Sequence, residues 1–139
     1  MRSVTLFPAV LLLLSCSPDS PETKIRKAFD TAVKAVEAGD AAGAVEILDP
    51  SFKGPEGMTK AEARVYLLGW FRHEKIGVTV VAQKLEVRGN QALQGVDLVL
   101  TGRSGASLLP QESSRRTLHL RWALSGKIWR VVEVSSEGV

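Results

Sequence analysis

The sequence predicts an α+β fold in which N-terminal helices pack on a curved, four-stranded antiparallel sheet. Two observations lead to this prediction. Between residues 20 and 71, apolar side chains recur at three- and four-residue spacing, which is typical of helices that bury one face. Between residues 78 and 134, apolar and polar side chains alternate and short turns separate the runs, which is typical of neighbouring antiparallel strands.

The first two helices are predicted from their end signals. Ser20-Pro21 combines an N-cap serine with a proline at the first helical position, and Gly39 is a typical helix end. Asp40 can cap a short second helix over residues 44–48, which ends before Pro50. The apolar stripe of the first helix consists of Ile25, Ala28, Phe29, Ala32, Val33 and Val36.

A third helix is predicted after a loop over residues 49–58. Thr59 and Glu62 have the spacing of a capping box, which marks a helix start. Apolar side chains cover a wide arc of this helix, so we expect it to be clasped against the sheet. They are Ala63, Val65, Tyr66, Leu67, Leu68, Trp70 and Phe71.

The strands are predicted from alternation and turns. Val78, Val80 and Ala82 share one apolar phase and Leu85 and Val87 the other, and this change of phase predicts a bulge in the first strand. Gly89-Asn90 and Ser125-Gly126 are predicted turns. The side chains expected to face the helices are Ala92, Val96, Leu98 and Leu100 in the second strand, and Leu118, Leu120, Trp122 and Leu124 in the third.

The N-terminus has the features of an export signal. Arg2 precedes an apolar run over residues 4–14, which is shorter than the ~20 residues that a bilayer-spanning helix needs. Leu13-Leu14-Ser15-Cys16 resembles the lipobox of bacterial lipoproteins, and Ser17-Pro18-Asp19-Ser20-Pro21 suits a tether. The alternative is a buried cysteine at the end of an apolar helix.

The lipobox resemblance implies a lipid anchor. It implies cleavage between Ser15 and Cys16, a diacylglycerol on the Cys16 thiol and acylation of the new amino terminus. The expected organisation is a cleaved signal over residues 1–15, a lipidated tether over 16–21 and one domain over 22–139. Because Ser17 rather than aspartate follows the cysteine, the family's sorting rule implies the periplasmic face of the outer membrane in a Gram-negative cell.

The order of elements resembles the nuclear transport factor 2-like superfamily, also called the cystatin-like α+β cone. The pieces that match are "EAGDAAGAVEIL", "GMTKAEARVYL" and "GKIWRVVEV". This superfamily includes ketosteroid isomerase, scytalone dehydratase and polyketide cyclases, so the resemblance implies a pocket between the first helix and the sheet. The candidates to line that cone are Phe29, Val33, Tyr66, Trp70, Trp122 and Trp129.

The predicted fold does not bring candidate catalytic side chains together in one pocket. Asp97 and His119 alternate against apolar neighbours and are expected to face water, unless the register slips by one residue. His73 is placed at a helix end and Asp49 in a turn. We therefore predict no catalytic residue, and the sequence shows no spacing typical of a metal or cofactor site.

Charge and composition limit the kinds of partner that we expect for this chain. The formal charge is +3 and the basic residues are scattered, without the stripe typical of a nucleic-acid surface. We expect a membrane-anchored, non-catalytic module that binds a small apolar ligand or an envelope protein, or forms a homodimer through its sheet face. The alternative is an isomerase or dehydratase that uses the cone pocket.

Overall fold

The computed structural model describes residues 19–104, 107–108 and 114–138. The predicted signal, Cys16 and the first tether residues lie outside this range. The elements in chain order are α1 (Pro21–Glu37), α2 (Ala41–Ala44), β1 (Leu48–Lys53), a 3-10 turn (Pro55–Gly57), α3 (Lys60–Phe71), β2 (Lys75–Arg88), β3 (Gln91–Ser104), β4 (Ser107–Leu108), β5 (Ser114–Ser125) and β6 (Ile128–Gly138).

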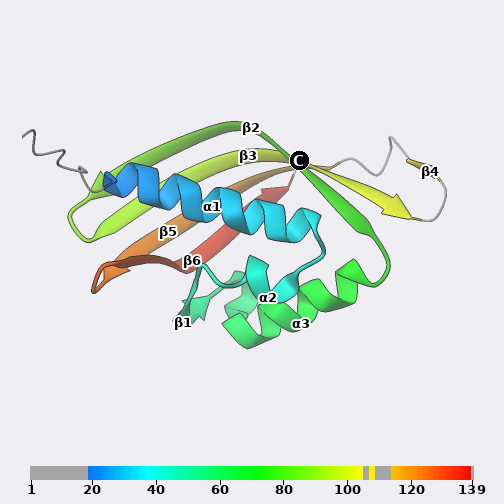
Figure 1. Cartoon of the computed structure of the whole chain (residues 1–139), viewed down its shortest axis with the longest axis horizontal. Helices are drawn as coiled ribbons and strands as arrows, with labels where there is room; N and C mark the ends of the chain where they lie inside the picture. The colour runs from blue at the N-terminus through cyan, green and yellow to red at the C-terminus, as the bar shows by residue number, and fades with distance from the viewer. Residues whose placement is uncertain (1–18, 105–106, 109–113, 139) are drawn as a thin grey trace, which may run out of the picture.

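The predicted α+β architecture is confirmed. One curved sheet has the order β1-β6-β5-β3-β2, with β4 added to β3. Strands β2, β3, β5 and β6 form the expected antiparallel meander, and α1 crosses the concave face of this sheet (Figure 1). The short α2 follows at the C-terminal end of α1, and α3 packs beside α2 and β1.

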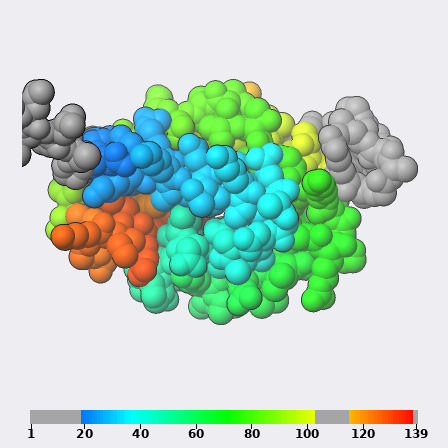
Figure 2. Space-filling view, in the orientation of Figure 1, coloured from blue at the N-terminus to red at the C-terminus, as the bar shows by residue number. Residues whose placement is uncertain are grey.

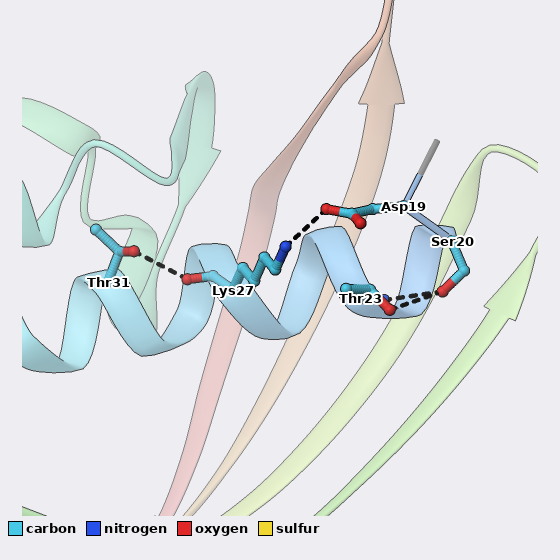
Figure 3. A network of polar contacts seen from close by, with 5 residues as sticks. All are labelled: Asp19, Ser20, Thr23, Lys27 and Thr31. Atoms are coloured by element: carbon cyan, nitrogen blue, oxygen red, sulfur yellow. Dashed lines mark hydrogen bonds and ion pairs between the residues drawn. The ribbon is translucent and has the colours of Figure 1, made fainter. Parts of the chain in front are cut away.

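The start of α1 is fixed by local polar contacts. The hydroxyl oxygen of Ser20 accepts a hydrogen bond from the backbone N–H of Thr23 at 3.2 Å, as an N-cap does. Lys27 Nζ lies 2.8 Å from Asp19 Oδ2, and Thr31 donates to the Lys27 carbonyl at 2.9 Å (Figure 3). The hydrogen bond from Lys27 lowers the pKa of Asp19 below its usual value. These contacts tie the chain just before the helix to the first turns of α1.

The core lies between α1 and the concave face of the sheet. Ile25 and Phe29 are buried in α1, as its apolar stripe predicts. Trp122 has no exposed surface and lies in the centre of the sheet on β5. The buried members of the core are Ile25, Phe29, Val45, Leu48, Phe52, Ala92, Val96, Leu98, Leu120, Trp122, Trp129 and Val131.

The strand predictions hold in the central sheet. The bulge in β2 falls between Val80 and Ala82, so Ala82 faces outward instead of continuing the inward row. The Gly89 and Gly126 turns both have positive φ, at 58° and 63°, which suits glycine. A second irregularity lies between Arg121 and Trp122, where β5 pairs with β6.

Strand β1 corrects the prediction for residues 44–53. The second helix ends at Ala44, and the region predicted as a helix end and loop pairs parallel to β6. Leu48 and Phe52 are buried on this edge strand, and burial of these side chains favours the extended conformation. Pro50 is tolerated because an edge strand does not need every backbone N–H for pairing. The sheet is therefore mixed rather than purely antiparallel.

Helix α3 forms as predicted, but it packs at the edge of the sheet beside β1 rather than across its face, with Ala63 and Leu67 half-buried against the core. The Thr59 hydroxyl oxygen accepts from the Glu62 backbone N–H at 3.2 Å, and the two side chains are 3.0 Å apart. No residue of α3 is buried. The helix contacts α2 and the edge strand β1, so its outward side has no described neighbour (Figure 1).

Candidate functional site

The residues expected to line a cone divide into two groups. Phe29, Trp122 and Trp129 are buried and pack with one another in a single core, and Val33 packs against its edge. Tyr66 is 60% exposed, which corrects the expectation that it lines the interior. Tyr66 is exposed because α3 lies at the β1 edge of the sheet rather than across its concave face.

Trp70 lies near Tyr66 on α3. Their ring centroids are 6.2 Å apart with a tilt of 48°. Trp70 is half-buried, and it is not one of the side chains that pack against the core. The space between α1 and the sheet is therefore occupied by apolar core side chains, and the two α3 aromatics lie outside it.

One polar side chain is buried inside this core. Gln94 on β3 is 2% exposed and shares the inward row with Ala92 and Val96. Its amide oxygen accepts from the indole N–H of Trp122 at 2.9 Å, and its amide nitrogen donates to Gln83 at 3.3 Å. Among the described residues, no buried side-chain nitrogen or oxygen lacks a partner. The Gln94 amide thus completes the hydrogen bonding of the Trp122 side chain.

The candidate acid–base residues do not converge. Asp97 and His119 lie on the outer face of the sheet, and Asp97 accepts from the Thr117 hydroxyl at 2.7 Å. His73 is exposed directly after α3. Asp49 accepts from the Ser51 hydroxyl at 2.6 Å, and this hydrogen bond lowers the pKa of Asp49. Asp97 and His119 are diagonal neighbours on β3 and β5, whereas His73 and Asp49 lie on other parts of the surface, so the four side chains form no shared catalytic centre.

A hollow lies on the outer face of the sheet, opposite α1. Its volume is about 580 Å³. Two cross-strand rows of outward side chains surround it. The first row runs Lys84, Gly95, His119 and Ser135, and the second runs Glu86, Leu93, Arg121 and Glu133.

Gly95 creates this hollow. A Cβ atom at Gly95 would meet no heavy atom within 4 Å, so the centre of the first row is open. Its two neighbours in the row, Lys84 and His119, stand on flanking strands that are ~10 Å apart from each other. Leu93 is 54% exposed and supplies apolar surface beside the gap.

The rim of the hollow carries both signs of charge. Arg121 Nη2 lies 3.0 Å from Glu133 Oε2, and His119 Nε2 lies 3.9 Å from Glu137 Oε1, an ion pair only when the imidazole is protonated. Apolar surface with alternating charges around it can hold a polypeptide segment through mixed contacts. It does not supply a buried, poised acid or base.

The described part of the chain contains neither a metal-binding cluster nor a bilayer-spanning helix. Within residues 19–104, 107–108 and 114–138, no three His, Cys, Asp or Glu side chains are grouped as a metal site would require. None of the helices in that part of the chain is both long and apolar enough to cross a bilayer.

Two residues of these sites, Gln94 and Gly95, were not predicted from the sequence. Gln94 lies between Ala92 and Val96 in strict alternation, so its parity alone indicates the inward face. Gly95 shows no such signal, because a glycine in a strand becomes a hollow only when both neighbouring strands are known.

Comparison with known proteins supports the fold. No family model matches the chain, and no curated protein matches it. A nuclear transport factor 2-like protein from Cytophaga hutchinsonii is 14% identical with a TM-score of 0.70, covering 87% of this chain and 100% of that one. A candidate dehydratase of the same family from Streptomyces avermitilis is 13% identical with a TM-score of 0.74, covering 88% and 99%.

A larger structure also contains this fold. A protein of Bdellovibrio bacteriovorus is 12% identical with a TM-score of 0.71, and the match covers 84% of this chain. This chain spans 41% of that protein's length. The fold is therefore nuclear transport factor 2-like, in agreement with the resemblance found in the sequence.

Proposed function

We propose that this chain is a lipid-anchored lipoprotein of the bacterial envelope, whose nuclear transport factor 2-like domain is a non-catalytic interaction module. The outer face of the sheet is its binding surface, and the partner is an envelope protein or a second copy of the chain. The Cys16 lipid holds the module at the periplasmic face of the outer membrane.

The observation that carries this proposal is the contrast between the two faces of the sheet. On the concave face, core side chains such as Phe29 and Trp122 pack against one another. On the outer face, a hollow of about 580 Å³ is bordered by Leu93 and by charged side chains. A partner can therefore bind to the outer face without displacing core side chains.

The anchor is supported by the sequence. Leu13-Leu14-Ser15-Cys16 follows a short apolar run, and Cys16 is the single cysteine of the chain. Two or three acyl chains give stable membrane attachment, because each buried methylene adds ~0.8 kcal/mol. Labelling cells with a tagged fatty acid tests this part: the wild-type chain takes the label and Cys16→Ser does not. Equal labelling of both would contradict the anchor.

The binding surface can be tested by photo-crosslinking in intact cells. A photoreactive amino acid at Leu93 is expected to give an adduct, because this side chain borders the hollow. The same reagent at Thr31, exposed on α1 on the other side of the sheet, is the matched control. The mass of the adduct distinguishes a second copy of the chain from another protein.

A filling variant completes this test. Gly95→Trp places an indole in the hollow, and its Cβ atom would meet no neighbouring heavy atom within 4 Å. We expect it to abolish the Leu93 adduct. The proposed surface is wrong if the Leu93 position gives no adduct beyond the Thr31 control, or if Gly95→Trp leaves the adduct unchanged.

The alternative function is an isomerase or dehydratase that works inside the cone. Its support is the likeness to the Streptomyces avermitilis candidate dehydratase, which concerns the fold. Such chemistry needs a proton-transfer group beside the substrate. Among the described residues, the buried polar side chain in this interior is the Gln94 amide, which neither gives nor takes a proton near neutral pH. The interaction module is therefore the better supported function.

A further inference from the structure

Helix α3 exposes three large apolar side chains to solvent. Val65 is 67% exposed, Tyr66 60% and Leu68 39%, and they follow one another closely in the helix. Among the described residues, the other large apolar side chains exposed to this degree are isolated on separate strands. A cluster of this kind on one helix marks a surface that is covered by a partner.

The surroundings of this cluster are aromatic and mostly basic, with Glu62 as one exposed acidic side chain a turn before Val65 and Tyr66. Tyr66 lies against Trp70, and both have an amphipathic ring of the type that is enriched at membrane interfaces. Arg64, Arg72 and Lys75 are exposed around the helix. The ion pairs between described residues involve other side chains, so these cations remain available to anionic groups.

The lipid anchor would keep a bilayer close to α3. Four residue steps separate Cys16 from the N-cap Ser20, and four residues of chain reach at most ~14 Å. Helix α1 has 17 residues and is therefore ~25 Å long. The α3 helix lies below the C-terminal half of α1, at the lower rim of the molecule (Figures 1 and 2).

We propose that the outward side of α3 is a second membrane contact, which lies in the headgroup region of an anionic bilayer. Val65, Tyr66 and Leu68 enter the apolar boundary, while Arg64 and Arg72 contact lipid phosphates. This inference rests on the proposed lipid anchor. With the anchor before the start of α1 and α3 below its C-terminal half, α1 lies along the membrane.

The anchor also explains why a small apolar patch suffices. Three exposed side chains give weak attachment to a bilayer by themselves. When Cys16 already holds the domain at the membrane, the second contact is intramolecular and profits from a high local concentration of lipid. In this arrangement α3 orients the domain and leaves the partner surface around Gly95 accessible.

Quenching of tryptophan by brominated lipids tests this contact. The acylated full-length protein is placed in vesicles of phosphatidylglycerol and phosphatidylcholine with bromine on the acyl chains. Two reporters, Val65→Trp on α3 and Leu93→Trp on the outer sheet face, are compared in a Trp70→Phe background, because both positions are exposed and the native Trp70 on α3 would itself be quenched. Val65→Trp is expected to lose fluorescence in brominated vesicles, whereas Leu93→Trp matches its unbrominated control.

Charge variants add a second readout. Arg64→Glu combined with Arg72→Glu should reduce the quenching of Val65→Trp, because the glutamates repel anionic headgroups. Vesicles of phosphatidylcholine alone should also reduce it. Equal quenching of both reporters, or no quenching of Val65→Trp, would overturn the membrane contact.

The outcomes distinguish this inference from the proposed function. Mass spectrometry of the purified protein shows whether Cys16 carries the lipid, independently of α3. A lipidated protein with unquenched Val65→Trp overturns only the α3 contact, and a protein without lipid overturns the anchor. If sedimentation shows that Val65→Glu dissociates a dimer of the full chain, a second copy covers α3 and the membrane contact is wrong.

Discussion

Replacing Phe29 by alanine is predicted to destabilise the domain strongly. Phe29 is 5% exposed, in the middle of the α1 stripe, and belongs to the same core as Trp122 and Trp129. Emptying a buried aromatic site typically costs ~3–5 kcal/mol. A domain of this size has a total stability of ~5–15 kcal/mol, so the variant would be marginal.

Urea denaturation followed by circular dichroism measures this effect. With an m-value of ~2 kcal/mol/M, the midpoint should fall by about 1.5–2.5 M. Lys34→Ala on the exposed side of α1 is the matched control and should cost under about 0.5 kcal/mol. If Phe29→Ala lowers the midpoint no more than Lys34→Ala, α1 does not pack on the sheet and the described core is incorrect.

Three further variants test single features. Gln94→Leu removes the acceptor of the buried Trp122 indole N–H and should cost ~1–3 kcal/mol in urea denaturation, while Gln91→Leu, exposed on the same strand, should cost little. Gly126→Ala forces alanine to a φ of 63° and should cost ~1–2 kcal/mol, whereas Gly95→Ala should not destabilise. The folded-state pKa of Asp49 is lowered, so its stabilisation is present above the unfolded value of 3.8 and is lost as the pH falls below it. Asp49→Asn should therefore flatten the acid limb of the stability profile, and an unchanged limb would refute the Ser51 contact.

The helix caps and the alternation in the strands were predicted correctly, because they depend on residues that are close in the sequence. The Ser20 and Asp40 caps and the Thr59–Glu62 pair formed as expected, because each depends on residues three positions apart. The alternation around Trp122 gave the inward row of β5 correctly, since a side-chain period of two is independent of the partner strand.

Features that depend on distant partners could not be predicted in the same way. The sequence of strand β1 contains Pro50 and is typical of a turn. Its extended conformation depends on pairing with β6, about eighty residues later in the chain. Tyr66 lies on a helix that is apolar on most sides, so periodicity could not decide which side faces the protein. The hollow at Gly95 arises from side chains of four strands, and their register is a tertiary property.

The most direct test of the filled interior is hydrogen exchange at the indole N–H groups, followed by NMR. The Trp122 N–H is fully buried and bonded to Gln94, so it should exchange only through unfolding of the domain. The Trp70 N–H, on the half-buried surface of α3, should exchange many times faster. If the Trp122 N–H exchanges as fast as that of Trp70, the space beneath α1 is open to water, and a cone pocket would replace the outer face as the candidate site.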